Sequence, residues 1–246
     1  MEVRWLGHST VLIELDGVRV LTDPLLRRRV VHLRRSTPAP AADANVDAVL
    51  ISHGHHDHLD LPSLRKLPRS VPVVVPQGLG ELVRKQGFGD VREVLAGDEL
   101  DVSGLRIRVS HAEHDPRRAG SSARAAPVGY ALLGSSRVFF AGDTDVFPGL
   151  GDIAADLDLA LVPIWGWGAK LGTGHLDPER AAEAVALLSP RVVVPIHWGT
   201  FRPLHNRARA GFLHDPVKEF AAAARERAPE VEVRVLAPGE SLTLQP

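Results

Sequence analysis

Histidine and aspartate side chains crowd one short segment, and their types and spacing suit metal binding. The stretch SHGHHDHLD, residues 52–60, places His53, His55, His56, Asp57 and His58 almost side by side. Two histidines separated by one residue at the end of a strand can both turn toward one ion. The adjacent Asp57 and His58 can face a second ion, since a tight turn re-aims successive side chains. The alternative is a solvated His-rich turn without a specific function, which this dense spacing disfavours.

Short apolar strands must position these residues. VDAVLIS, residues 46–52, is a buried-type strand that ends where the histidines begin. Three other segments with metal-type residues follow predicted strands in the same way: HAEHD follows residues 105–110, GDTD follows 138–141 and IHWGTF follows 192–195. The tryptophans of PIWGWG lie at the exit of the strand at 159–163. Metal-type residues therefore recur at strand exits.

The remaining pattern is that of an α/β protein. Strands are expected at residues 3–6, 11–15 and 18–21, with Asp16-Gly17 as a hairpin turn, and at 71–75 and 128–133. Helices are expected at 61–67, at 79–86, after the N-cap Asp177 with Pro178 at the first helical position, and from about residue 216. Two strands should close the chain. Residues 27–42 and 115–127 are predicted loops that cover something or are disordered.

Composition narrows the class of protein. The 246 residues predict one domain spanning 1–246, and 44% hydrophobic with 24% charged residues is typical of a globular chain. A net charge of −1 argues against a nucleic-acid-binding surface over the whole protein. Cysteine is absent, so any metal must be held by nitrogen and oxygen ligands. The N-terminus lacks a secretory pattern and no segment has transmembrane length, which predicts a cytoplasmic protein.

The segment from His53 to His58 resembles the H-x-H-x-D-H motif of the metallo-β-lactamase superfamily. That family has a four-layer αββα sandwich fold that binds two metals at one edge, and the later strand-end segments match it in order. The resemblance implies that His53, His55 and one histidine of HAEHD hold the first metal. It implies that Asp57, His58 and His197 hold the second, and that Asp143 bridges both.

Two histidines compete for the ligand position in HAEHD. His111 comes directly after the strand, whereas family members usually carry this ligand a few residues into the loop, so we expect His114 to be the ligand. His111 is then a packed or supporting residue. His56 is left without a ligand role.

A particular branch of the superfamily is similar in several further motifs. GHSTVLIE, TDP at residues 22–24, DHLD, AGDTDVFP, GHLDPERAAEA and PIHWGTF resemble the branch with L-ascorbate-6-phosphate lactonase and N-acyl-phosphatidylethanolamine phospholipase D. A phosphodiesterase or a lactonase or esterase is therefore expected. Phospholipid substrates are less expected, because no long N-terminal extension or membrane-binding amphipathic helix is evident.

The ligand set itself favours hydrolysis. Two nearby divalent cations can share a water, lower its pKa and present a bridging hydroxide near neutral pH, while one cation polarises the substrate. With two carboxylates the formal site charge is about plus one, which favours a small anionic substrate. We expect Asp57, Asp143 and His175 to be catalytic, with His175 acting as proton donor or substrate partner. A loop histidine that only packs at the helix entry is the alternative. Asp60 is expected to orient a ligand histidine.

Side chains near the strand exits could bind substrate. Trp165 and Trp167 are interpreted either as an apolar wall of the substrate-binding pocket or as core residues. The arginines of LLRRRVVHLRRS, and Arg117 with Arg118, could bind an acidic substrate or form a solvated charged face.

Other functional classes remain as alternatives. A redox relative with two irons would resemble H-x-E-x-D-H, but position 55 is histidine and no flavin-binding domain follows. A nuclease of this fold would carry an added domain and a broader basic face, and a partner-binding relative would not need the complete ligand set. Zinc suits the His-rich set best, and manganese or iron would be tolerated. We expect no nucleic-acid or membrane partner, and homo-oligomerisation is open.

Overall fold

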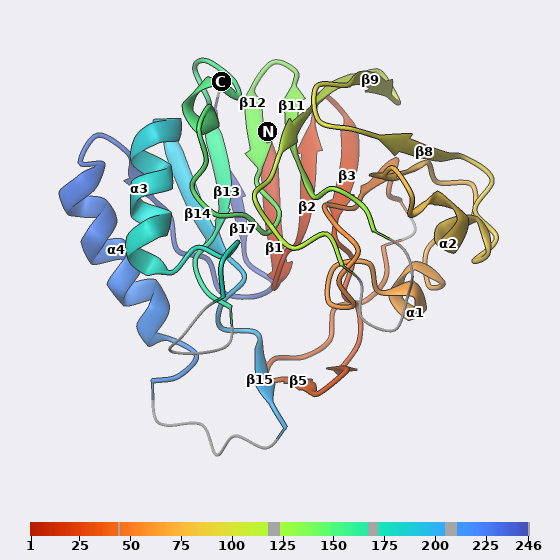
Figure 1. The fold of residues 1–246 in the computed structure, drawn as a ribbon, viewed down its shortest axis with the longest axis horizontal. Coiled ribbons are helices and arrows are strands. Elements are labelled where there is room, and N and C mark those ends of the chain that lie inside the picture. The colour runs from red at the N-terminus through yellow and green to blue at the C-terminus, as the bar shows by residue number, and fades with distance from the viewer. Residues whose placement is uncertain (44, 118–123, 167–171, 205–210, 246) are drawn as a thin grey trace.

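Short apolar strands build two sheets that pack face to face, with helices on the outside (Figure 1). The computed structural model describes residues 1–43, 45–117, 124–166, 172–204 and 211–245. Helices α1 and α2 lie beside one sheet, and α3 and α4 cover the other. The αββα sandwich predicted from the motif resemblance is confirmed.

The first sheet joins the N-terminal half to the end of the chain, in the order β17-β1-β2-β3-β6-β7-β8. Its members are β1 (Glu2–Gly7), β2 (Thr10–Leu15), β3 (Val18–Thr22), β6 (Ala48–Leu50), β7 (Val73–Pro76), β8 (Val91–Val94) and β17 (Ser241–Thr243). Asp16 and Gly17 have φ of 53° and 80°, as a tight turn between β2 and β3 requires, so the hairpin prediction is confirmed.

The second sheet has the order β16-β14-β13-β12-β11-β10-β9. Its members are β9 (Glu99–Val102), β10 (Leu105–His111), β11 (Val128–Leu133), β12 (Arg137–Phe140), β13 (Leu159–Pro163), β14 (Val192–Ile196) and β16 (Glu232–Val233). Strands β12, β13 and β14 run parallel, so their carboxyl ends meet at one edge. Strands β8 and β9 were missed by the sequence prediction because their exposed polar residues hide the pattern.

In the part of the chain that the structure describes, four α-helices complete the layers: α1 (Leu61–Leu64), α2 (Gly80–Arg84), α3 (Pro178–Leu188) and α4 (Asp215–Arg227). Helix α3 begins as predicted, because the Asp177 side chain accepts a hydrogen bond from the Arg180 N–H and proline occupies the first turn. One hydrophobic cluster includes Trp5 and Ile13 of the first sheet, Phe139 of the second and Phe220 of α4. Among the described residues, no helix combines the length and apolar character needed to cross a membrane.

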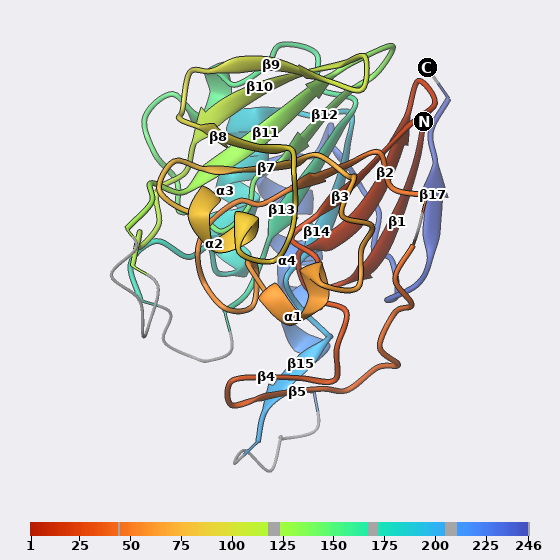
Figure 2. The ribbon, with the colours of Figure 1, turned by 90° about the vertical axis from the view of Figure 1, so that its right-hand side faces the viewer.

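A small third sheet forms where the sequence predicted only a loop. Strands β4 (Arg29–Val30) and β5 (Leu33–Arg35) make a hairpin, and β5 pairs with β15 (Phe201–Pro203). The prediction for residues 27–42 was wrong because β15 lies far away in sequence. Figures 1 and 2 place this small sheet below the two large ones, at the edge where β14 ends.

Helix α4 should depend on one aromatic anchor. Phe220 is fully buried, so Phe220→Ala should lower the free energy of unfolding by about 3–5 kcal/mol. The matched control is Leu187→Ala on α3, where the side chain is 47% exposed and truncation should cost less than about 0.5 kcal/mol. Urea unfolding followed by circular dichroism measures both. Equal losses in the two variants would contradict this packing.

Candidate metal centre

The predicted ligands come from separate strands and gather at one edge of the sandwich. His53, His55, Asp57 and His58 lie in the turn after β6, and the other three lie after β10, β12 and β14: His114, Asp143 and His197. Their nitrogen and oxygen atoms fall into groups whose members lie within 4.8 Å of one another. The structure thus brings these residues together at one edge, and their role as metal ligands stays a prediction.

The first group contains His53, His55 and His114. His114 Nε2 lies 3.1 Å from His55 Nδ1, and the His53 ring packs against both others at 4.6 Å between ring centroids. His53 and His114 are buried, while His55 is half-buried. Three nitrogen donors thus face one small volume.

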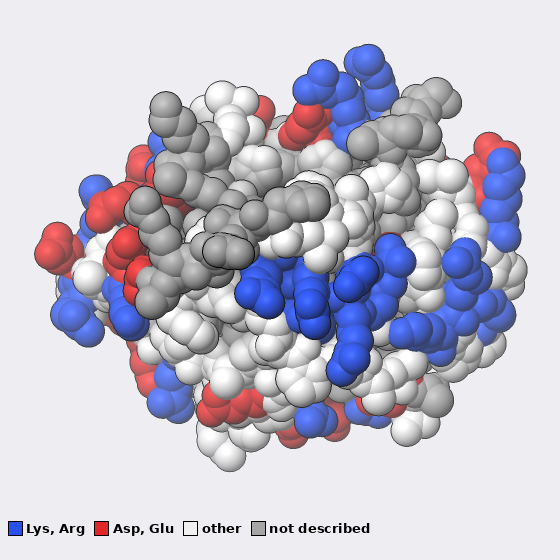
Figure 3. All heavy atoms as spheres, turned by 90° about the horizontal axis from the view of Figure 1, so that it is seen from below, with Lys and Arg blue, Asp and Glu red and all other residues white. Residues whose placement is uncertain are grey.

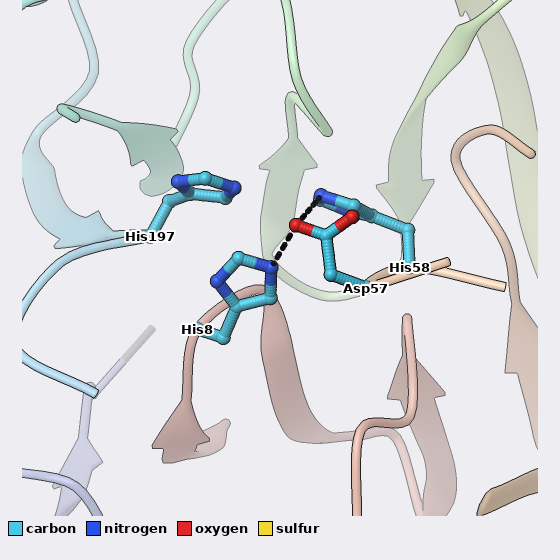
Figure 4. Close-up of side chains that lie close together, drawn as sticks. All are labelled: His8, Asp57, His58 and His197. Carbon is cyan, nitrogen blue, oxygen red and sulfur yellow. Dashed lines mark hydrogen bonds and ion pairs between the residues drawn. The ribbon is translucent and has the colours of Figure 1, made fainter. Parts of the chain in front are cut away.

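The second group contains the predicted Asp57, His58 and His197, and also His8 from the turn between β1 and β2 (Figure 4). His8 Nε2 donates to Asp57 Oδ2 at 3.2 Å, and the His8 and His197 rings lie 4.0 Å apart. His8 was not assigned a role from the sequence, although it belongs to the quoted motif GHSTVLIE. Its hydrogen bond holds the Asp57 carboxylate in place.

Asp143 connects the two groups. Its Oδ2 lies 3.3 Å from Nε2 of both His58 and His197, and it also forms a group with His114 and His175. Among the described residues, its buried Oδ1 has no hydrogen-bond partner. The carboxylate therefore has one oxygen toward the second group and another available for a ligand.

Hydrogen bonds at Nδ1 orient four of the histidine rings. Nδ1 of His58 donates to Asp23 Oδ2 at 2.7 Å, Nδ1 of His114 to the Gly174 carbonyl at 2.5 Å, and Nδ1 of His197 to the Trp165 carbonyl at 2.5 Å. Nδ1 of His53 lies 3.0 Å from Ser52 Oγ. In each ring Nε2 is then left facing the cluster, which is how proteins fix the tautomer of metal-binding histidines.

Asp23 takes the orienting role that the sequence analysis gave to Asp60. Asp23 is fully buried, accepts from the backbone and hydroxyl of Ser52, and binds His58. Asp60 instead contacts Ser63 at the start of α1 and Arg27. The prediction for Asp60 was wrong because it follows the histidines too closely to turn back. Asp23 lies in the quoted TDP motif, which was the available signal.

Two strained turns carry His8 and His197. Their φ values are 56° and 65°, a left-handed region that costs non-glycine residues roughly 1–3 kcal/mol. The His197 N–H donates to the His8 carbonyl at 3.0 Å, and the same carbonyl accepts from the Trp5 indole at 2.8 Å. Trp5 stacks on Trp198 with 5.2 Å between ring centroids. The indole pair thus stabilises the backbone that places both histidines.

Glycine is required just before Asp143. Gly142 has φ of 64°, and a Cβ there would lie 2.6 Å from the Ser52 Cβ. Ser52 itself contacts Asp23 and His53. The close approach of these two loops brings Asp143 against the histidine segment.

The surroundings set the protonation of the cluster. Burial lowers the pKa of His8 to about 3 and of His114 to about 4, and holds the pKa of His53 well below its ordinary value. Burial alone would raise the pKa of Asp143, but His197 and His58 outweigh it and hold this pKa well below the usual range. These residues are therefore in the forms that bind a cation.

The pKa of His58 is shifted in the opposite direction, because His58 lies among three carboxylates. Burial opposes its protonation, but Asp143, Asp57 and Asp23 raise its pKa well above 6.5. The Asp57 pKa is held well below its usual range, because His58 and His8 outweigh the effect of burial. A metal that binds Nε2 of His58 must displace a proton, so binding should release protons.

The donor set fits two divalent ions. Ligands at about 2.0–2.1 Å in tetrahedral geometry lie roughly 3.3 Å from each other, close to the contacts of 3.1 Å and 3.3 Å between the candidate ligand atoms. Buried Nε2 of His53 and Oδ1 of Asp143 have no hydrogen-bond partner among the described residues. Such buried polar atoms need a partner, and a cation supplies one.

The other predicted site residues differ in position. The His175 ring packs on His114 at 4.6 Å, at the start of the segment that leads into α3. His111 is exposed and contacts Glu113 and Phe147, away from the groups above, and His56 is half-buried. Trp165 is 7% exposed and packs on Phe212, so its substrate-binding role stays a prediction. Trp167 and Arg118 lie outside the described residues.

Comparisons with known proteins identify the family of the chain. Residues 18–198 match the model of the beta-lactamase superfamily domain. A UPF0173 metal-dependent hydrolase of Methanopyrus kandleri is 34% identical, covering 98% of this chain and 99% of that protein. N-acyl-phosphatidylethanolamine-hydrolyzing phospholipase D 1 of Caenorhabditis elegans is 32% identical, covering 80% of this chain and 63% of that enzyme.

A solved structure extends the likeness to three dimensions. Igni18, a metallo hydrolase of Ignicoccus hospitalis, superposes with a TM-score of 0.72 at 25% identity and covers 99% of this chain and 98% of its own. The chain therefore belongs to the β-lactamase superfamily. Within it, the chain falls in the branch that includes the nematode phospholipase and acts as a metal-dependent hydrolase.

Loss of the Asp23 carboxylate should weaken metal binding without removing a ligand. Asp23→Ala should lower metal affinity about 10–100-fold, because His58 loses the partner that orients its ring. Asp60→Asn is the matched control, since asparagine still caps α1 and its metal affinity should stay near that of the wild type. Competition with a chromophoric chelator measures both affinities. A larger effect at Asp60 would reverse the two assignments.

Stability of the chelator-treated protein should fall as the pH drops from about 6.5 toward 4. The folded-state pKa values of His8, His53 and His114 lie below 6.5, so the unfolded chain takes up protons that the folded protein does not. Each of these histidines lowers the free energy of unfolding by up to roughly 1.4 kcal/mol for each pH unit below 6.5. The stabilising effect of protonated His58 is complete below pH 6.5 and is lost only at higher pH.

Urea midpoints across this pH range measure the effect, and the His114→Gln protein should show a shallower dependence. A midpoint that does not change between pH 6.5 and 4 would refute the neutral buried histidines.

Proposed function

We propose that the chain is a dinuclear hydrolase of small anionic esters, with phosphodiesters first and lactones or carboxylic esters second. The observation that carries this is Asp143, whose carboxylate lies between the His53, His55 and His114 group and the Asp57, His58 and His197 group. Zinc is the preferred metal for this histidine-rich set, with manganese or iron tolerated. When bound, such a metal pair supplies Lewis acidity and a water of lowered pKa.

The protein side chains supply the remaining steps. Asp57 is held by His8 and Asp143 by His58 and His197, so both carboxylates stay ionised and fixed during turnover. His175 is half-buried against His114, within reach of a substrate that enters the cluster. We assign it the donation of a proton to the leaving oxygen, or a hydrogen bond to the substrate.

A cavity beside the cluster provides a path for substrate. Its volume is about 460 Å³, and it is lined by residues from two loops, including His114, Arg117, Arg124 and Gly174. Arg117 pairs with Asp115 at 2.6 Å, so we assign the attraction of an anionic substrate group to Arg124, which makes no ion pair among the described residues. The name of the nematode relative, a phospholipase D, supports the phosphodiester choice.

Asp143→Ala should abolish turnover of bis(p-nitrophenyl) phosphate by zinc- or manganese-loaded protein and should loosen metal binding. The reason is the loss of the carboxylate between both groups. Release of p-nitrophenolate and metal content of the dialysed protein are the two measurements. Activity that persists in a metal-free Asp143→Ala preparation would defeat the proposal.

Two further measurements refine the choice of reaction. His175→Gln should lower kcat by about 10²–10⁴-fold while metal content stays near that of the wild type. If protein that contains two metals fails to hydrolyse the phosphodiester, lactones and carboxylic esters become the substrates to test.

A further inference from the structure

The small third sheet presents arginines on one face and apolar residues on the other. Its inner face packs Val30, Leu33 and Phe201 with Leu25. On its outer face, register pairs Arg29 with Arg34 and Arg34 with Arg202 across all three strands. Like charges placed directly opposite one another destabilise a sheet. We call Arg29, Arg34 and Arg202 the arginine row. Because the row lowers stability, the presence of these arginines must have another reason.

The arginine row lacks acidic partners within the part of the chain that the structure describes. Neither its three members nor the neighbouring Arg28 makes an ion pair there, whereas Arg27 pairs with Asp60 at 2.7 Å. Figure 3 shows basic side chains gathered in the middle of this face, with few acidic ones among them. The net charge of the chain is only −1, so the positive charge is concentrated locally rather than general.

A cavity opens next to the row. Its volume is about 280 Å³, and it is lined by Arg28, Arg34, Arg35, Ser36, Thr37 and Pro38. Arg35 is 6% exposed and is held by the carbonyl oxygens of Leu6 and Leu25, so a buried positive charge lies at the wall. Arginines and hydroxyls around one concave space suit a group with several acceptor oxygens.

The same sheet is joined to the metal edge at two points. Strand β15 begins shortly after His197, and the Ser36 N–H donates to the Thr200 carbonyl at 2.8 Å. Arg27 reaches Asp60, which follows the histidine segment. A ligand on the arginine row would thus lie on the side of the protein where the candidate metal centre is found.

We propose that the arginine row and its cavity form a phosphate-binding site separate from the metal cluster. The ligand is a phosphate group, carried by a soluble phosphate ester or by a phospholipid headgroup. The site goes beyond the proposed function, because it binds through arginines rather than metal and can be measured without turnover. Val31 and Leu204, which are 70% and 41% exposed at the end of this sheet, would matter for the lipid source alone.

The test measures binding to the metal-loaded protein in two arms. Calorimetry follows glycerol 3-phosphate, and co-sedimentation follows vesicles of phosphatidylcholine with or without phosphatidylglycerol. Replacement of Arg29, Arg34 and Arg202 together by Gln should weaken binding on the order of a hundredfold, about fivefold for each arginine. A higher salt concentration should also weaken binding to the wild-type protein, because salt screens the charges of the arginines.

Controls separate this site from the metal cluster and from general charge. Arg106→Gln removes an exposed strand arginine of β10 and should leave binding unchanged. Asp143→Ala should also retain binding, so that failure of the hydrolase proposal would not affect this result. The triple variant should unfold at the same temperature as the wild type or higher, because it relieves repulsion.

Each outcome has a defined meaning. Binding of glycerol 3-phosphate that depends on the row supports the site with a soluble ligand. Binding only to anionic vesicles, reduced further by Val31→Asn, supports it with a lipid headgroup. Absence of binding in both arms, or binding that the triple variant retains in full, overturns the proposal.

Discussion

The rest of the structure depends on keeping histidines and carboxylates together in a buried cluster. Removing ionisable groups from water is costly, and each must be compensated by a hydrogen bond, an opposite charge or a metal. Here the compensation is built in layers. Asp23 and main-chain carbonyls hold the outer nitrogens, Asp143 and Asp57 face the inner ones, and the sandwich encloses both. The fold supplies this enclosure because parallel strands end together at one edge.

Much of this arrangement could be predicted from local sequence. The histidine segment, Asp143 and His197 each begin within three residues of the end of a short apolar strand, so position in the chain indicates position at the edge. The choice of His114 over His111 came instead from the resemblance to the family. The same reasoning placed α3 and the first hairpin, because an N-cap, a proline and a turn dipeptide act within a few residues. Local signals were sufficient wherever local geometry decides the structure.

Other features could not be predicted because they depend on contacts between distant segments. Asp23 and His58 are 35 residues apart and meet only when β3 pairs with β6. His8 reaches Asp57 across 49 residues, and neither residue carries a mark of that contact. The pairing of β5 with β15 likewise joins segments more than half the chain apart, and it turned an apparent loop into a sheet. The sequence analysis assigned the orienting role to Asp60 because Asp60 is close to the histidines in sequence. In the structure Asp60 instead contacts Ser63, and the carboxylate that contacts His58 Nδ1 is Asp23.

Charge distribution links the candidate metal centre to the surface beside it. The cluster holds the carboxylates of Asp23, Asp57 and Asp143, and the arginine row adds positive charge at the same edge without any acidic partner among the described residues. The carboxylates of the cluster favour a cation and the arginine row favours an anion, although the chain as a whole is almost neutral. Like-charge repulsion in the row and strain at His8 and His197 lower the stability of the fold. A ligand that binds only the folded state raises stability and so compensates for such losses. A cation in the cluster would stabilise the carboxylates there, and an anion on the arginine row would stabilise the arginines.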